Sequence, residues 1–472
     1  MRAPREAFVI GSGPNGLTAA IVLAKAGIQT TLLEAQKVVG GGMRSAELTL
    51  PGFLHDVCSA IHPMGLSSPA FLSFPLAEHG LSWIDPPLPV AHPFDDGSAA
   101  VLERSLEQTG ARLGADGRAY TQAVRPWIDQ WPELTREILQ PLIHWPSHPL
   151  LLAGFGLAAL WPAASTARRR FASEAARALF AGIAGHSVLP LEAPGSASFG
   201  WVLAVAAHAA GWPVPRGGSQ RIANALASYF TSLGGRVETG ARVQTIDQFD
   251  STSLVMCDVT PRQFAVLASR RLPSGFQRQL HRYRYGPGVF KLDWALSAPI
   301  PWRARECAQA STIHVGGTLD EIAASERAAW EGRTDERPFL IVTQSSLFDD
   351  LRAPARKHTA WAYCHVPNGS AIDMTETMEN QIERFAPGFR DCILARHTLS
   401  PKAIEERNEN LIGGDITGGA QDLRQLLLRP THMLYRTPLD NVYLCSSSTP
   451  PGGGVHGMCG YNAARTALAD CK

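Results

Sequence analysis

Charged residues are scarce in this chain of 472 residues. Lys, Arg, Asp and Glu make up 18% of it, against the roughly 25% of an ordinary soluble domain. The two signs nearly cancel, leaving a net charge of +1, so we expect no nucleic-acid partner. Apolar residues make up 45%, which argues against a mainly disordered chain. The length predicts about three structural units.

Closely paired cysteines are also missing. The eight cysteines stand at positions 58, 257, 307, 364, 392, 445, 459 and 471, and no two are spaced as CxxC. This pattern argues against a structural zinc site and a disulfide framework, and it favours a reducing compartment. We therefore expect no metal. The GxSxG, HExxH and P-loop motifs are absent from the sequence, which argues against the hydrolases and P-loop enzymes that carry them.

No apolar run is long enough to cross a bilayer. The longest covers residues 150–164 and contains Pro162, whereas a transmembrane helix needs about 20 residues. The first residues, MRAPRE, lack the apolar segment of a secretion signal. We expect a cytoplasmic protein that is either soluble or peripherally bound to the inner face of a membrane.

The strongest signal that is present covers residues 7–34. Ala7–Ile10 is an apolar run of strand length, a GxGxxG turn follows, and apolar residues then recur at helical spacing up to Gly27. A second strand-like run ends at Glu34. This order is typical of a dinucleotide site, in which the glycines and a helix N-terminus approach the pyrophosphate and the acidic residue binds a ribose. The predicted binding residues are Gly11, Gly13, Pro14, Asn15, Gly16, Glu34 and Ala35.

A second glycine cluster follows Glu34 within eight residues. It reads Gly40-Gly-Gly-Met-Arg44, and with it the sequence resembles the phytoene-desaturase-like and amine-oxidase-like flavoproteins. The resemblance implies FAD as the cofactor, because this long dinucleotide needs a second close backbone approach and a cation. It assigns cofactor contacts to Gly41, Gly42, Met43 and Arg44.

The resemblance continues at the other end of the chain. A strand-like run at residues 441–445 precedes PPGGGVHGMCGYN at 450–462. In the resembling family this segment lies along the flavin, with a helix N-terminus at its pyrimidine edge. The segment supplies Gly454, Val455, His456, Met458, Cys459 and Gly460 as predicted cofactor residues. A covalent link from Cys459 to the flavin is the disfavoured alternative.

The middle of the chain predicts a helix capped by Ser219, followed by short strands at residues 236–239 and 242–246. In the resembling family the position of Val243 contacts adenine, and plain core packing is the alternative. Further stretches are similar to the branch called pyridine nucleotide-disulphide oxidoreductase domain-containing protein 2, or phytoene dehydrogenase-related. They cover residues 53–56, 285–296, 386–389 and 412–416.

The predicted fold class is α/β with three parts. A Rossmann-like FAD-binding domain is formed by residues 1–65, 212–262 and 436–472. A mixed-sheet substrate domain is formed by residues 66–120 and 263–435. Residues 121–211 form a helical cap, whose apolar helices are either buried or in contact with a membrane surface, with Arg168–Arg170 facing anionic headgroups.

The resemblance implies an FAD-dependent oxidoreductase that removes or transfers hydride on an apolar, isoprenoid-like, polyene-like or lipid-like substrate. A desaturase, a dehydrogenase and an isomerase all fit this description. The sequence has no second dinucleotide turn, which favours oxygen or a quinone as the electron acceptor. An amine oxidase and a non-catalytic carrier of prenylated or lipid partners stay open as alternatives.

The candidate catalytic residues are histidines near the second glycine cluster. His62 and His55 are the main candidates, and a structural hydrogen bond is the alternative role for His62. Weaker candidates are Asp56, His208, Tyr363 and His365.

Overall fold

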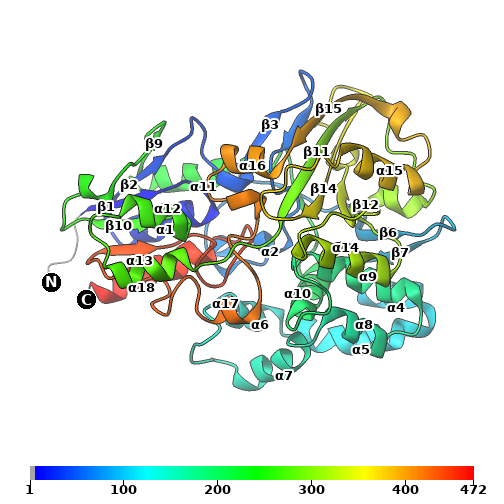
Figure 1. Ribbon diagram of the computed structural model, residues 1–472, viewed down its shortest axis with the longest axis horizontal. Helices are drawn as coiled ribbons and strands as arrows, with labels where there is room; N and C mark the ends of the chain where they lie inside the picture. The colour runs from blue at the N-terminus through cyan, green and yellow to red at the C-terminus, as the bar shows by residue number, and fades with distance from the viewer. Residues whose placement is uncertain (1–5, 472) are drawn as a thin grey trace.

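The structure, a computed structural model, describes residues 6–471 as two main sheets and a group of helices (Figure 1). The smaller sheet lies near both ends of the chain, and the larger sheet lies at the opposite end of the molecule. The helices of the cap lie beside the larger sheet. The expectation that the chain begins without a secretion signal concerns mainly residues 1–5, which lie outside the described residues.

The smaller sheet has five parallel strands in the order β16-β10-β1-β2-β9. The strands are β1 (Glu6–Ile10), β2 (Gln29–Glu34), β9 (Arg236–Thr239), β10 (Leu254–Cys257) and β16 (Val442–Leu444). One face packs against α1 (Pro14–Lys25), α11 (Gln220–Ser232) and α18 (Met458–Asp470), and the other against α12 (Pro261–Leu267) and α13 (Ser274–His281). A parallel sheet covered on both faces is the predicted Rossmann-like arrangement.

Three local predictions differ from the structure. Residues 241–245 form no strand, because the chain leaves the sheet once Ala241 N has donated a hydrogen bond to Glu34 O. Ser219 precedes α11 but does not cap it, since its hydroxyl bonds His62 and Ser59 O instead. Helices α12 and α13 pack on the five-stranded sheet, beyond the boundary predicted at residue 262. The domain ranges as a whole stay a prediction.

The larger sheet has seven strands in the order β15-β11-β14-β13-β12-β6-β7. Strands β6 and β12 are parallel and the other neighbours are antiparallel, which confirms the predicted mixed sheet. Its strands are β6 (Leu88–Pro93), β7 (Ala99–Leu102), β11 (Gly288–Leu296), β12 (Ala310–Val315), β13 (Leu340–Thr343), β14 (His358–Val366) and β15 (Ile393–Leu399). Helix α15 (Thr375–Phe385) covers one face, and α14 (Leu319–Trp330) contacts the other together with the cap.

Seven helices between residues 106 and 209 form the cap, which begins earlier than predicted. They are α4 (Leu106–Arg112), α5 (Gly117–Ile128), α6 (Trp131–Ile138), α7 (Pro149–Ala159), α8 (Ala163–Arg170), α9 (Glu174–Gly185) and α10 (Ser196–Ala209). Large apolar side chains such as Leu134, Phe180 and Trp201 fill the interior. Among the described helices, none is by itself long and apolar enough to span a membrane, and α7 and α8 satisfy that test only together, with a bend of 90° between them.

Short elements join these parts. The two-stranded ribbons pair β3 (Ser45–Glu47) with β4 (Leu54–Asp56), and β5 (Trp83–Ile84) with β8 (Val214–Pro215). The remaining short helices are α2 (Pro63–Leu66), α3 (Pro69–Leu72), α16 (Pro401–Arg407) and α17 (Leu423–Leu427). The segments around α2 and after α16 reach the space between the two sheets, where the candidate site lies.

Candidate active site

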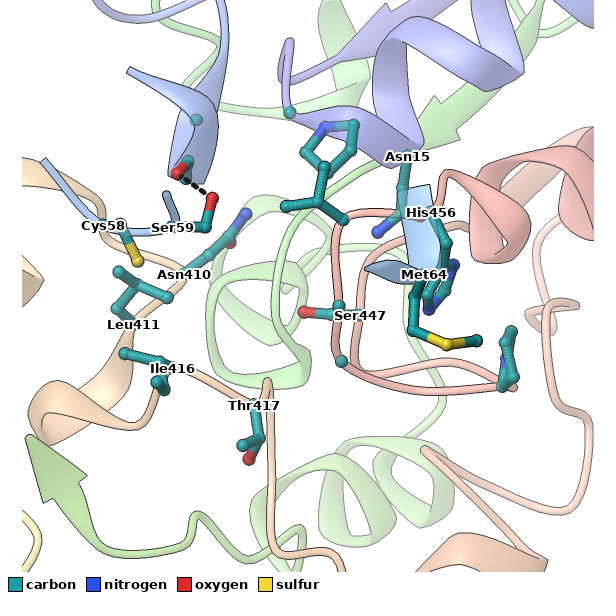
Figure 2. Close-up of a pocket in the computed structure, with 18 of the residues that line it drawn as sticks. Asn15, Cys58, Ser59, Met64, Asn410, Leu411, Ile416, Thr417, Ser447 and His456 are labelled. Atoms are coloured by element: carbon teal, nitrogen blue, oxygen red, sulfur yellow. Dashed lines mark hydrogen bonds between the residues drawn. The ribbon is translucent and has the colours of Figure 1, made fainter. Parts of the chain in front are cut away.

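One cavity of about 1020 Å³ extends from the smaller sheet to the cap. At one end its wall is the Gly11–Asn15 turn with residues 453–456, and at the other end it is formed by helices of the cap and by the larger sheet. Figure 2 shows Asn15, Met64 and His456 on one side of this space and Cys58, Leu411 and Ile416 on the other. The cavity therefore joins segments that are far apart in the sequence.

Backbone without side chains forms the wall near the five-stranded sheet. Gly11 has a φ of +99°, a conformation that favours glycine. A Cβ atom on Gly41 would lie 3.0 Å from Gly13 Cα, so the two glycine clusters meet closely. Pro14, Asn15 and Gly42 lie on the same wall. The N-terminus of α1, with its positive dipole end, faces this region.

Glu34 lies at the end of β2 on the cavity wall, next to Ala35. Its Oε2 atom accepts hydrogen bonds from the Ser12 backbone N at 3.0 Å and from the Ser12 hydroxyl. Its Oε1 atom accepts from Gln36 N at 2.8 Å and lies 3.2 Å from Arg44 Nη2. These contacts fix the carboxylate beside the glycine turn. Arg44 and Val243 also line the cavity.

Asp258, directly after β10, was not predicted to belong to the site. Its Oδ2 atom accepts a hydrogen bond from Gly16 N at 2.9 Å, and a Cβ atom on Gly13 would lie 2.9 Å from the same oxygen. Burial, with a smaller contribution from the nearby Glu34 charge, raises the pKa of Asp258 to about 7. A neutral carboxyl tolerates a pyrophosphate close by, whereas a carboxylate repels it.

Three predicted residues of the C-terminal segment line the cavity: Gly454, Val455 and His456. Burial lowers the pKa of His456 to about 4, so its imidazole is neutral near pH 7. Its Nδ1 atom accepts a hydrogen bond from Met458 N at 3.0 Å. The backbone N–H group of Met458, which was predicted to face the flavin, is therefore already bonded within the protein.

Five predicted cofactor residues lie behind the wall: Gly16, Met43, Met458, Cys459 and Gly460. Gly16 and Gly460 allow close packing instead, because their Cβ atoms would lie 2.0 Å from Gly11 O and 1.8 Å from Asn15 O. Met43 is in the apolar core, and Cys459 Sγ donates to Gly452 O at 3.2 Å. The direct contacts of these five residues with the cofactor stay predictions, and the link through Cys459 stays the disfavoured alternative.

The two main histidine candidates have different surroundings. His62 lines the cavity, its Nε2 atom lies 2.9 Å from Ser219 Oγ, and its buried Nδ1 atom has no partner among the described residues. Burial lowers its pKa to about 4. His55 does not line the cavity: it bonds Thr49 Oγ1 at 2.8 Å, and burial lowers its pKa to about 3. A catalytic role for His55 stays a prediction, and the residue lies outside the cavity wall.

The weaker candidates are mostly held in structural contacts. Asp56 pairs with Arg352 at 2.7 Å, His208 bonds Tyr120 at 2.9 Å, and His365 pairs with Glu326 at 2.7 Å. None of the three lines the cavity, whereas Tyr363 does.

The chain is similar in sequence to several known proteins. Residues 9–74 match the family described as NAD(P)-binding Rossmann-like domain. The chain is 27% identical to the Mus musculus protein called pyridine nucleotide-disulfide oxidoreductase domain-containing protein 2, over 99% of this chain and 94% of that protein. It is 31% identical to hydroxyneurosporene desaturase of Cereibacter sphaeroides, over 51% of this chain and 50% of that protein.

The chain is a homologue of pyridine nucleotide-disulfide oxidoreductase domain-containing protein 2. Among solved structures, a putrescine oxidase triple mutant has a similar fold, with a TM-score of 0.63 at 17% identity over 99% of this chain and 98% of that chain. Together these relations indicate an FAD-dependent oxidoreductase: its relatives by sequence include carotenoid desaturases, and it shares its fold with putrescine oxidase.

The cavity of this homologue fits FAD at the end near the five-stranded sheet. The paired glycine clusters leave a bare backbone cradle, and the buried Asn15 Oδ1 atom on its wall has no hydrogen-bond partner among the described residues. Glu34 and Arg44 supply an acceptor and a cation beside the cradle. These residues would hold the dinucleotide, and the cavity wall continues from them to His456 and the cap.

Arg429 organises the wall of the same site from behind. Its guanidinium is fully buried and donates hydrogen bonds to Gly418 O at 3.0 Å and to Ser447 O at 2.9 Å. These bonds tie the segment around Thr417 to the segment around Ser447, and both segments line the cavity. Arg429 belongs to no local sequence motif, because its partners are backbone atoms brought close only by the fold.

Proposed function

We propose that this protein oxidises an apolar, lipid-like or isoprenoid-like substrate, removing or transferring hydride, and is reoxidised by oxygen or a quinone. The observation that carries the proposal is the composition of the cavity wall at the cap. There it consists mainly of aliphatic and aromatic side chains, including Leu139, Leu152, Phe155, Ala159, Phe199, Val202 and Leu203. Such a wall favours apolar ligands because it removes their surface from water.

When bound, FAD supplies a hydride acceptor that releases its electrons to oxygen or to a quinone. The residues of the chain hold the cofactor, orient the substrate and exclude water. We assign binding of the dinucleotide to Gly11, Gly13, Glu34, Gly41 and Arg44. His62 holds its proton on one ring nitrogen and stays neutral, which suits hydrogen bonding to a ligand better than strong base catalysis.

A spectroscopic experiment tests the substrate class. The FAD-bound protein is mixed anaerobically with isoprenoid hydrocarbons, with carotenoids and with primary amines, and the flavin absorbance is followed. Bleaching by an isoprenoid or a carotenoid, followed by recovery when oxygen or a quinone is added, is the expected result. Bleaching by amines alone would replace the proposal with amine oxidation, and a protein that fails to retain any flavin would favour a carrier.

We also propose that the cap contacts a membrane surface. Large apolar side chains are exposed around α7, and together they form the cap patch: Leu142, Ile143, Trp145, Leu150, Leu157, Leu160 and Trp161. Trp145 is 95% exposed and Leu150 is 89% exposed. Other residues of α7, Leu152 and Phe155, line the cavity. An apolar ligand could therefore pass from a lipid surface to the cavity along one helix.

Arg168–Arg170 were predicted to face the anionic headgroups of the membrane, but each of the three has a partner within the protein. Arg168 pairs with Asp320, Arg169 lies over the Trp161 ring at 4.5 Å, and Arg170 lies over the Trp201 ring at 5.4 Å. The three guanidinium groups are thus engaged within the protein, and the apolar side chains carry the proposal.

Co-sedimentation with liposomes tests the membrane contact. The double change Trp145→Ser and Leu150→Ser is expected to lower the bound fraction at least fivefold, because it removes two apolar side chains from the interface. Leu351→Ser is the matched control, since Leu351 is 51% exposed and lies outside the cap patch. Equal binding of the double variant and the wild type would contradict the proposal.

A further inference from the structure

Several polar side chains lie close together where the cavity meets the larger sheet. His186, Trp212, Thr312, Trp361 and Tyr363 line the cavity there, and we call this set the histidine end. Trp212 Nε1 donates to Thr312 Oγ1 at 2.8 Å, so these two groups satisfy each other. His186 and Tyr363, by contrast, each keep one polar atom to which no described residue forms a hydrogen bond.

The backbone register explains why these groups meet. His314 on β12 is paired with Ile341 on β13, and Ile341 is paired with Tyr363 on β14. Residues paired in this way project from the same face of a sheet. His186 follows α9 as its C-cap residue, and its Nε2 atom lies 2.9 Å from His314 Nε2. The histidine pair and Tyr363 therefore share one face, which is turned to the cavity.

The contact between the two histidines determines which ring nitrogen of His186 carries a hydrogen and can donate it to a ligand. Only one of the two Nε2 atoms can carry the hydrogen between them. Burial lowers the pKa of His186 to about 3 and lowers that of His314 well below its usual value, so both rings are neutral. His314 Nδ1 is buried without a partner among the described residues. Placing the proton on His314 Nε2 avoids a buried, unpaired N–H group there, and it leaves His186 with an N–H at Nδ1.

Three donors at the histidine end then lack a partner among the described residues: Trp361 Nε1, which is fully enclosed, and His186 Nδ1 and the Tyr363 hydroxyl, which are not. His186 and Tyr363 both line the cavity. The charged groups near this end are already paired, Lys291 with Asp293 at 2.5 Å and Glu326 with His365 at 2.7 Å. A charged ligand group would find no counter-ion there and would lose its hydration.

We propose that the histidine end binds a neutral oxygen atom at one end of the apolar substrate, such as that of a hydroxyl or carbonyl group, through His186 Nδ1 and the Tyr363 hydroxyl. The proposal rests on the apolar substrate proposed above and adds a specificity to it. An apolar chain that carries this oxygen satisfies both donors, and a pure hydrocarbon of equal length leaves them unpaired. Leaving a buried donor unpaired is costly, so the two ligands are distinguished.

The test compares farnesol with farnesene, which share a carbon skeleton; farnesene has a fourth double bond in place of the hydroxyl group of farnesol. Binding to the FAD-bound protein is measured by the change in flavin absorbance or in tryptophan fluorescence. Wild-type protein is expected to bind farnesol about tenfold more tightly than farnesene. In Tyr363→Phe and in His186→Leu this ratio is expected to fall to threefold or less, through weaker farnesol binding with farnesene binding unchanged.

Tyr120→Phe is the matched control. Tyr120 also has its hydroxyl bonded to a histidine, His208 at 2.9 Å, but it does not line the cavity, and this variant is expected to keep the tenfold ratio. Equal binding of farnesol and farnesene to the wild type, or an unchanged ratio in both Tyr363→Phe and His186→Leu, would overturn the proposal for the histidine end but not the proposal of an apolar substrate. Binding of neither ligand would overturn the apolar substrate itself, and the histidine end with it.

Discussion

The two ends of the cavity are built in different ways. Near the five-stranded sheet the wall is mainly backbone, with glycines at positions where a Cβ atom would collide with other backbone atoms. Near the cap the wall is mainly apolar side chains from α6, α7 and α10. A backbone wall tolerates few substitutions and suits a cofactor of fixed shape, whereas a wall of side chains can change shape by substitution and suits a variable substrate. The two ends should therefore respond separately to mutation.

The largest effect is expected from filling the backbone cradle. Gly41→Val places a branched side chain at a φ of +53° and a Cβ atom 3.0 Å from Gly13 Cα. FAD binding is expected to weaken by about 100-fold or more, since both the conformation and the space are lost. Gly27→Val is the control, because Gly27 has a φ of +83° with no atom near its Cβ position. Equal FAD content in the two purified variants would contradict a cradle at Gly41.

The second effect concerns the cap end alone. Gly156 lines the cavity on α7, and no atom lies within 4 Å of the position of its Cβ. Gly156→Phe is expected to fill part of the cavity, which weakens farnesene binding about tenfold and leaves FAD content unchanged. Leu157→Phe, at the neighbouring exposed position, is expected to change neither. Loss of FAD in Gly156→Phe would show that the two ends are not independent.

An effect on stability, and not on ligand binding, is expected from Asp258, whose carboxyl group makes the stability of the backbone end depend on pH. Its pKa is raised to about 7, mainly by burial, so the folded protein holds a proton that the unfolded chain releases near pH 4. The stabilisation from this proton is complete below pH 4 and is lost as the pH rises toward 7 and beyond. Asp258→Asn is expected to gain roughly 2–4 kcal/mol in unfolding free energy over the wild type between pH 4 and 8. Denaturant unfolding at several pH values measures the difference, and parallel pH curves for the two proteins would contradict it.

The smallest effect is expected from Arg168. Its pairing with Asp320 joins two exposed side chains, and such pairs contribute at most about 1 kcal/mol. Arg168→Ala is expected to change liposome binding less than twofold, whereas a guanidinium placed against anionic headgroups would contribute about 1 kcal/mol, or roughly fivefold. A fivefold loss on anionic liposomes would restore the predicted role of the basic run.

The same contrast explains how much could be predicted from the sequence. The turn and helix at residues 11–25 are local, so the order of apolar runs and glycines was sufficient to predict them, and Glu34 lies on the cavity wall as expected. Asp258 and Asn410 reach the site only because β10 lies beside β1 and because Asn410 Nδ2 donates to Asp258 O at 2.8 Å. The residues next to Asp258 and Asn410 in the sequence form no motif that would predict these contacts.

The cap shows which features could not be predicted from the sequence. Its apolar helices could be predicted from their composition, but which faces line the cavity depends on how the helices pack. The helix N-terminus at Met458 was predicted to face the flavin, and the structure uses it to pack α18 against α1 through Gly460. The pairing of His186 with His314 spans 128 residues, and no short spacing in the sequence could indicate it.

The five-stranded sheet has a consequence for the order of biosynthesis. Its edge strand β16 and the cavity residues that follow it, 447–456, leave the ribosome after more than 440 other residues. The first glycine turn can fold early, but the wall that encloses a dinucleotide is closed only when these late residues arrive. We therefore expect the coenzyme to bind only after this segment has been synthesised, and a chain truncated before β16 should be purified without its yellow colour.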